Sequence, residues 1–117
     1  MHELAVTEGI LKICEEEYKK NNFKKINEIR IKVGELTGLV PNCIDYYFEI
    51  ISSNTIAEGA KLIINKLPIK IHCKECSYEG EIGKGEYACP KCKSYSINII
   101  NGREFYVDSL EVDKDGD

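Results

Sequence analysis

The hydrophobic period changes twice along the first half of the chain. From Leu4 to Asn21 apolar residues recur every three or four positions, which predicts an amphipathic helix. Residues 28–33 alternate strictly between charged and apolar, which predicts a strand with one buried face. A second helical pattern covers residues 41–51, with either Pro41 in the first turn or Asn42 as the N-cap. The order helix, strand, helix is therefore expected.

The second half carries two further strand patterns separated by a different kind of segment. Residues 62–67 form the first of these strands, and residues 103–112 the second, with a bulge near Ser109 where the apolar parity shifts. Two helices on a three-stranded sheet would bury the alternating isoleucines, and the segment between the last two strands contains the cysteine pairs 73/76 and 89/92. We therefore predict an α+β fold with an inserted zinc ribbon. Because these last two strands flank the insert, we expect them to pair antiparallel.

This pattern also predicts the domain organisation. Residues 1–69 and 101–113 would form one discontinuous α/β domain, and residues 70–100 the zinc-ribbon domain, followed by a frayed tail at residues 114–117. Without residues 70–100, the rest of the chain is near the size at which a hydrophobic core alone gives only marginal stability. A structural metal would therefore contribute to folding.

The inserted segment contains four cysteines in two pairs, Cys73-Lys-Glu-Cys76 and Cys89-Pro-Lys-Cys92, with twelve residues between the pairs. Two such turns can place four thiolates at the corners of a tetrahedron, which suits zinc and excludes calcium and magnesium. Iron is the alternative metal, because the second pair resembles half of a rubredoxin site. His72 could replace one ligand, but a polar residue at a strand end explains it as well.

A shell of four thiolates leaves no open position for water or substrate, so this site predicts a structural role. No nucleophile–base pair accompanies it, and we expect no enzyme activity. The other two cysteines, Cys14 and Cys43, have apolar neighbours in the predicted helices, and each is expected to be a small buried residue.

The charge balance limits the choice of partners. The chain of 117 residues has a formal charge of −4, and four thiolates with one zinc ion would add −4 + 2 = −2, giving −6. This acidic balance argues against nucleic-acid binding. No secretory apolar segment follows Met1, and no apolar run is long enough to span a membrane. We therefore expect a cytoplasmic protein.

The amino terminus is a second candidate metal site. The free amine, the His2 peptide nitrogen and the His2 imidazole can chelate one ion through adjoining rings, and Glu3 adds a carboxylate or a backbone nitrogen. Nitrogen donors of this kind suit divalent nickel or copper in a tetragonal arrangement. The alternative is an exposed polar residue that precedes a helix.

Several of these motifs occur together, and in this order, in the HypA/HybF family of hydrogenase maturation proteins. The chain resembles that family in these segments: Met1-His2-Glu3-Leu4, residues 31–39 followed by Pro41, Ala57-Glu58-Gly59-Ala60, the two cysteine pairs, and Gly102-Arg103-Glu104. The resemblance implies a nickel metallochaperone that works with the GTPase HypB. Together they would load nickel into the large subunit of a nickel–iron hydrogenase.

The resemblance also assigns the metal ligands. It places Ni(II) on His2 with the main-chain nitrogens of Met1, His2 and Glu3, and it makes Cys73, Cys76, Cys89 and Cys92 the structural zinc ligands. Some relatives carry an Asp after the Gly-Glu motif, whereas residues 37–40 here lack a carboxylate, which favours nitrogen donors. Some members also serve urease, so urease maturation proteins are further candidate partners. The competing hypothesis is a zinc-ribbon protein-interaction module without metal transfer.

Overall fold

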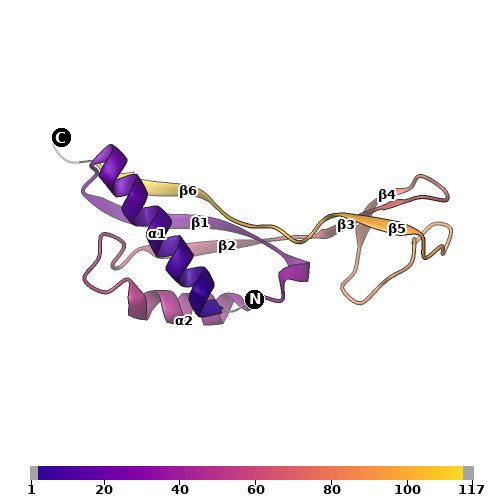
Figure 1. Cartoon of the computed structure of the whole chain (residues 1–117), viewed down its shortest axis with the longest axis horizontal. Coiled ribbons are helices and arrows are strands. Elements are labelled where there is room, and N and C mark those ends of the chain that lie inside the picture. The colour runs from indigo at the N-terminus through magenta and orange to yellow at the C-terminus, as the bar shows by residue number, and fades with distance from the viewer. Residues whose placement is uncertain (1–2, 115–117) are drawn as a thin grey trace. The chain divides into compact units, whose positions relative to one another are not determined.

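The computed structural model describes residues 3–114. The elements follow the order α1 (Glu3–Asn21), β1 (Lys25–Gly34), the 3-10 turn η1 (Glu35–Thr37), α2 (Pro41–Ile51), β2 (Lys61–Leu67), β3 (Ile69–Cys73), β4 (Glu79–Ile82), β5 (Ile97–Asn101) and β6 (Phe105–Asp113) (Figure 1). This α+β fold of two helices and two small sheets confirms the predicted fold class.

Contacts between residues divide the chain into two compact units. The first unit comprises Met1–Ile31, Leu39–Asn65 and Tyr106–Asp117, and the second comprises Lys32–Gly38 and Lys66–Phe105. The segment expected to bind metal, residues 70–100, lies inside the second unit. That unit also includes the end of β1 and the η1 turn.

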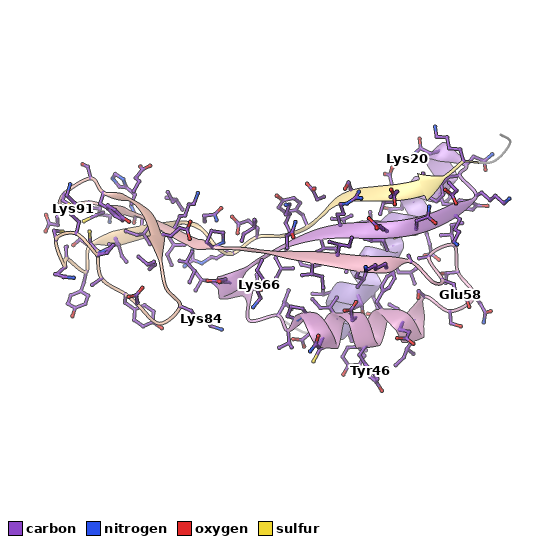
Figure 2. All side chains as sticks on the ribbon, turned by 180° about the vertical axis from the view of Figure 1, so that it is seen from behind. Lys20, Tyr46, Glu58, Lys66, Lys84 and Lys91 are labelled. Carbon is purple, nitrogen blue, oxygen red and sulfur yellow. The ribbon has the colours of Figure 1, made fainter. Side chains whose placement is uncertain are left out.

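The first unit is built on β1, the central strand of a sheet in the order β2-β1-β6. The side chains of Ile26, Ile29 and Ile31 on this strand are fully buried. The Lys24 N–H donates to the Asp113 carbonyl at 2.7 Å, next to the start of β1 and at the end of β6. Helix α1 crosses one face of this sheet, as the two opposite views show (Figures 1 and 2).

The expected pairing of the two strands that flank the insert is wrong. Strands β2 and β6 are not neighbours, because each pairs with β1 and forms an edge of the sheet. Their side chains are half-buried or exposed, whereas β1 buries five of its residues. A strand with this much apolar surface is best placed at the centre, where both of its backbone edges are hydrogen-bonded.

The two helices begin and end near the predicted residues. Pro41 is the first residue of α2, as expected, but Val40 is the N-cap, so the alternative with Asn42 as the cap is wrong. Proline fits this position because its missing N–H would have no partner in the first turn. Helix α2 buries Ile44 and Phe48, and α1 buries Ile10 and Cys14, so each helix contributes one apolar face to the core.

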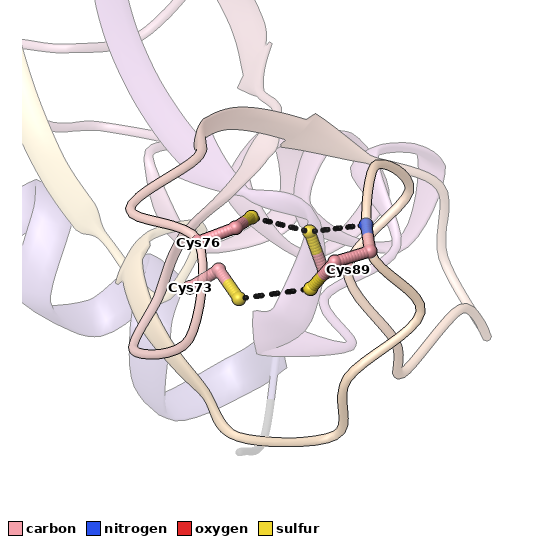
Figure 3. A group of neighbouring side chains, drawn as sticks. Cys73, Cys76 and Cys89 are labelled. Carbon is pink, nitrogen blue, oxygen red and sulfur yellow. Dashed lines mark hydrogen bonds between the residues drawn. The ribbon is translucent and has the colours of Figure 1, made fainter.

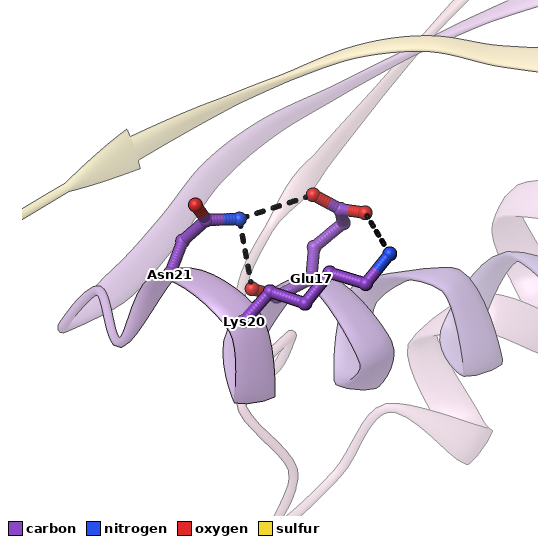
Figure 4. A network of polar contacts seen from close by, with 3 residues as sticks. All are labelled: Glu17, Lys20 and Asn21. Carbon is purple, nitrogen blue, oxygen red and sulfur yellow. Dashed lines mark hydrogen bonds and ion pairs between the residues drawn. The ribbon is translucent and has the colours of Figure 1, made fainter.

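The last turn of α1 is held by exposed polar contacts (Figure 4). The Asn21 amide donates to both the carbonyl and the side-chain carboxylate of Glu17 at 3.2 Å, and the Lys20 ammonium lies 3.8 Å from the other carboxylate oxygen. Exposed ion pairs of this kind contribute at most about 1 kcal/mol. Asn22 then takes a left-handed conformation with φ 55°, which ends the helix.

The second unit contains a sheet in the order β4-β3-β5, with β3 in the centre. Both neighbours are antiparallel to β3, and Ile71 lies opposite Gly80 on β4 and Ile99 on β5. Ile69 and Ile71 are buried, and β3 ends at Cys73. The short sheet therefore positions the first cysteine pair.

A close approach of two backbone segments within the second unit explains why residue 34 is a glycine. The Gly34 N–H donates to the Glu104 carbonyl at 2.7 Å, and the Leu36 N–H donates to the Gly102 carbonyl at 2.8 Å. A Cβ atom on Gly34 would overlap the Gly102 carbonyl oxygen. Neither backbone segment can move away without losing these hydrogen bonds, so only glycine fits at position 34.

We therefore expect Gly34→Ala to lower the free energy of unfolding by about 2–4 kcal/mol, because the methyl group overlaps a backbone carbonyl. Thermal or urea unfolding measures the effect. Gly9→Ala is the matched control, since Gly9 lies inside α1 with no atom within 4 Å of its Cβ position. That substitution is expected to stabilise the protein by about 0.5–1 kcal/mol. Equal stability of the two variants would contradict the close approach.

Candidate metal centre

The four cysteines of the two pairs converge on one point. All four Sγ atoms lie within 4.8 Å of one another, with Cys73 3.6 Å from Cys92 and Cys76 3.7 Å from Cys89 (Figure 3). A tetrahedron with zinc–sulfur bonds of about 2.3 Å has sulfur–sulfur edges of about 3.8 Å. A disulfide would need a separation of about 2.05 Å. The arrangement therefore fits a four-thiolate metal site and not two disulfides.

The two cysteine turns share one backbone geometry. In the first turn the Ser77 N–H donates to the Cys73 carbonyl at 3.0 Å, and in the second the Lys93 N–H donates to the Cys89 carbonyl at 2.9 Å. Ser77 and Lys93, each four residues after the first cysteine, have φ of 64° and 67°. The left-handed residue closes the turn and brings both sulfurs of a pair to the same side.

Backbone N–H groups support negative charge on the second turn. The Cys89 sulfur accepts hydrogen bonds from the N–H groups of Lys91 at 3.4 Å and Cys92 at 3.5 Å. Burial raises the pKa of the Cys89 thiol, but these two backbone bonds and contacts with the Cys76 and Cys92 side chains outweigh it, giving a pKa of about 6 instead of 9.0. The Cys89 sulfur is therefore prepared to bind a cation as thiolate.

Burial of the four sulfur ligands is uneven. Cys73 and Cys89 are fully buried, Cys76 is half-buried and Cys92 is exposed. The cluster thus has one side, at Cys92, that is open to solvent. Among the described residues, these four cysteines form the group that could hold a metal ion, and His72 is not part of that group. The His72 Nδ1 instead lies 2.9 Å from a Glu79 carboxylate oxygen on β4.

The predicted nickel ligands Met1 and His2 lie outside the described residues. Glu3, the first residue of α1, accepts a hydrogen bond from the Val40 N–H on its carboxylate at 3.2 Å. This contact ties the start of α1 to the N-cap of α2. Sequence reasoning missed it, because Val40 donates through its backbone and no side-chain motif marks the position.

The two remaining cysteines have different surroundings. Cys14 is fully buried, as predicted, and burial followed by the nearby Glu15 charge raises its pKa to about 11. Cys43 is exposed, so the prediction that it is buried is wrong. The buried face of α2 is centred on Ile44 and Phe48, and one residue corresponds to a rotation of about 100° around a helix. Cys43 is thereby turned out of the core.

In metal-loaded protein at pH 8, we expect one thiol per chain to react rapidly with an aromatic disulfide reagent. Cys43 is accessible, whereas Cys14 is buried and, with a pKa of about 11, is ionised to only about one part in a thousand. Cys43→Ser should remove the fast phase. A fast phase that persists in that variant would mean that the cluster thiolates, not Cys43, are the reactive groups.

Comparison with known proteins identifies the family. The sequence model described as "Hydrogenase/urease nickel incorporation, metallochaperone, hypA" matches residues 1–112. The chain belongs to the HypA family. It is 40% identical over 113 residues to hydrogenase maturation factor HypA 2 of Bradyrhizobium diazoefficiens, covering 97% of this chain and 100% of that protein. It is 36% identical over 114 residues to HypA of Caldanaerobacter subterraneus, with the same shares.

Solved HypA structures have the same fold. The solution structure of the nickel metallochaperone HypA from Helicobacter pylori aligns with a TM-score of 0.68 and 27% identity, covering 98% of this chain and 100% of that one. A second HypA solution structure aligns with a TM-score of 0.72 and 30% identity, covering 96% of each chain. The predicted family resemblance is confirmed. HypA proteins are metallochaperones and not enzymes, in agreement with the sequence prediction.

No helix in residues 3–114 has the length and apolar character needed to cross a lipid bilayer.

Proposed function

We propose that this protein carries Ni(II) on its amino terminus and delivers it for hydrogenase maturation, while a structural zinc ion holds the four-cysteine cluster. The family match carries the proposal, because it spans residues 1–112 and so includes the amino terminus and both cysteine pairs. The nickel ligands are His2 and the main-chain nitrogens of Met1, His2 and Glu3. The zinc ligands are Cys73, Cys76, Cys89 and Cys92.

The start of α1 favours main-chain nitrogen ligands. Glu3 is the first residue of the helix, and N–H groups in a first helical turn have no intrahelical acceptor. Metal binding at its nitrogen therefore breaks no helical hydrogen bond. Deprotonated peptide nitrogens also carry negative charge, which the positive end of the helix dipole stabilises. The Glu3 carboxylate accepts the Val40 N–H, so the backbone nitrogen is the better candidate donor on this residue.

A terminal site has the properties that a carrier needs. Fraying of a few terminal residues can release the ion without unfolding the core. The His2 imidazole must be neutral to bind, so lower pH is expected to weaken nickel binding. The cluster, by contrast, is closed by four protein ligands and retains its ion while the cargo is exchanged.

The identity of the cluster metal can be tested directly. Purified protein is expected to contain one zinc per chain and to be colourless, since zinc has a filled d shell. One iron per chain with a red visible spectrum would instead establish a rubredoxin-like centre. The sulfur geometry fits both ions, so metal analysis and the spectrum decide between them.

We further propose that the partners are the GTPase HypB and the large subunit of a nickel–iron hydrogenase, with the protein acting in the cytoplasm. The family description also includes urease, so urease maturation proteins are additional candidate recipients. The test uses nickel-loaded protein mixed with purified HypB and nickel-free large subunit, separated by size exclusion and analysed for metal. Nickel should move to the large subunit with wild type and not with His2→Ala. Equal transfer by both proteins would contradict the proposed carrier site.

A further inference from the structure

Helix α2 has a second apolar face, of which three residues are exposed and one, Tyr47, is half-buried. Cys43, Tyr46, Tyr47 and Ile50 occupy positions i, i+3, i+4 and i+7, which lie on one side of a helix. Tyr46 is 64% exposed and Ile50 56%, whereas Ile44 and Phe48 on the inner side are buried. Tyr46 projects away from the strands (Figure 2). We call Cys43, Tyr46, Tyr47 and Ile50 the outer face of α2.

The outer face is ordered by its own contacts. The Tyr46 and Tyr47 rings meet edge to face, with centroids 5.5 Å apart and an interplanar angle of 68°. Val40, which is 47% exposed, continues the apolar surface one turn toward the start of the helix. Large rigid aromatic residues grouped with aliphatic ones are typical of the centre of a protein–protein interface.

The charges beside this face have one sign. From Leu39 to Ala60 the chain contains three carboxylates and no Lys, Arg or His. Two of these carboxylates, Asp45 and Glu49, lie on α2, where Glu49 is one turn from Tyr46 around the exposed side. A partner that covers the outer face would therefore meet negative charge along one flank.

A hollow on the acidic flank of α2 extends this surface. It has a volume of about 730 Å³ and is lined by Asp45, Phe48, Glu49 and Glu58, together with residues of the loop that follows α2. Of the described residues that line it, only Lys61 is basic. A long cationic side chain entering this hollow would have its charge close to carboxylates.

We propose that the outer face of α2 binds an amphipathic helix of a partner protein, with apolar residues against Tyr46 and Ile50 and Lys or Arg residues against Asp45 and Glu49. The apolar face of the partner helix packs against the exposed apolar side chains of α2 and supplies the apolar contact. Opposite charges along the flank fix the orientation and raise the association rate. None of the four residues of the outer face is a proposed nickel ligand.

Charge selects this occupant over a second copy of the chain. Two outer faces packed against each other would bring Asp45 and Glu49 of both copies together, with no basic residue on either helix to neutralise them. Nucleic acid is disfavoured for the same reason, because its phosphates would meet carboxylates.

The test uses a fluorescein-labelled helical peptide with leucines along one face and lysines along its flanks. Fluorescence anisotropy measures its affinity for the metal-loaded full chain. The double variant Tyr46→Ser/Ile50→Ser should weaken binding about tenfold or more, since central aromatic residues dominate interface energies. Glu49→Lys should also weaken it, and more at low salt than at high salt. Bound peptide should slow the reaction of Cys43 with thiol reagents.

Two matched controls separate specific docking from general attraction. Tyr95→Ser removes a tyrosine that is 82% exposed in the second unit, and Glu8→Lys reverses an exposed charge on α1. Neither should change affinity by more than about twofold, as expected for surface positions outside an interface. Circular dichroism confirms that each variant is folded.

Three outcomes would overturn the proposal. Equal affinity of wild type and Tyr46→Ser/Ile50→Ser would show that the peptide binds elsewhere. Equal loss in Glu49→Lys and Glu8→Lys would mean that only net charge matters. A dimer in sedimentation equilibrium that becomes monomeric in the Tyr46→Ser/Ile50→Ser variant would assign the outer face to a second copy of the chain.

Discussion

Replacing Cys76 by Ser is expected to abolish stoichiometric zinc binding and to unfold the segment around the cluster. Cys76 is half-buried and its sulfur lies 3.7 Å from that of Cys89, so it supplies one vertex of the tetrahedron. A serine hydroxyl is a harder and more weakly coordinating ligand than a thiolate. The binding energy of a structural zinc ion, about 10–16 kcal/mol in small metal-dependent domains, is also the folding energy of such a segment.

The loss of structure in Cys76→Ser should be confined to part of the chain. Strand β3 leads into Cys73, and β5 follows the second cysteine pair, so residues of this sheet should lose protection against amide hydrogen exchange. The first unit has its own buried side chains on α1, β1 and α2 and should keep its protection. Zinc analysis and hydrogen exchange measure the two effects.

Cys43→Ser is the matched control for this experiment, because it removes an exposed thiol of α2 that is not part of the cluster. It should retain one zinc per chain and an unchanged exchange pattern. If Cys76→Ser also retained one tightly bound zinc, the four-thiolate assignment would fail and a different fourth ligand, such as His72, would have to be considered.

Extending the amino terminus by two residues is expected to weaken nickel binding by about 100-fold or more, even though every side chain is retained. The extension moves the free amine away from His2 and breaks the adjoining chelate rings. Loss of a group that only supports a metal ligand already costs about 10- to 100-fold in affinity, so loss of a ligand should cost at least as much. Competition with a chelating dye measures the affinity.

The control for this prediction is the same two residues added after Asp117. Zinc content and thermal stability should be unchanged in both extended proteins, because neither extension replaces a side chain that is buried in residues 3–114. If the amino-terminal extension left nickel affinity unchanged, the terminal amine could not be a ligand. Nickel would then be bound by side chains alone.

The local features of the chain were the most predictable part of the structure. The spacing of the four cysteines predicted their convergence, because a Cys-x-x-Cys turn fixes the geometry of each pair within four residues. The alternation of Ile29, Ile31 and Val33 with charged residues predicted the buried strand β1. The limits of α1 and α2 followed from Asn21, Pro41 and Ser52, since turn and cap residues act on their immediate neighbours.

Features that depend on distant partners were not predictable. Strand β1 lies between β2 and β6 in the sheet. The prediction that β2 and β6 pair with each other rested only on their positions on either side of the insert, and it was wrong. Cys43 is exposed because α2 packs on the core through its other face, although the apolar neighbours of Cys43 suggested burial. The approach of Gly34 to Gly102 joins segments far apart in the chain. A single sequence carries no signal for such contacts.

The most direct test of the account is a calorimetric nickel titration of zinc-loaded protein with a native amino terminus, comparing wild type, His2→Ala and His72→Ala. His72 is the only other histidine, and its Nδ1 lies 2.9 Å from Glu79 in the second unit, so it is a matched control. We predict one nickel site in wild type and His72→Ala and none of comparable affinity in His2→Ala. Equal binding by wild type and His2→Ala would contradict the proposal that this protein carries nickel on its amino terminus.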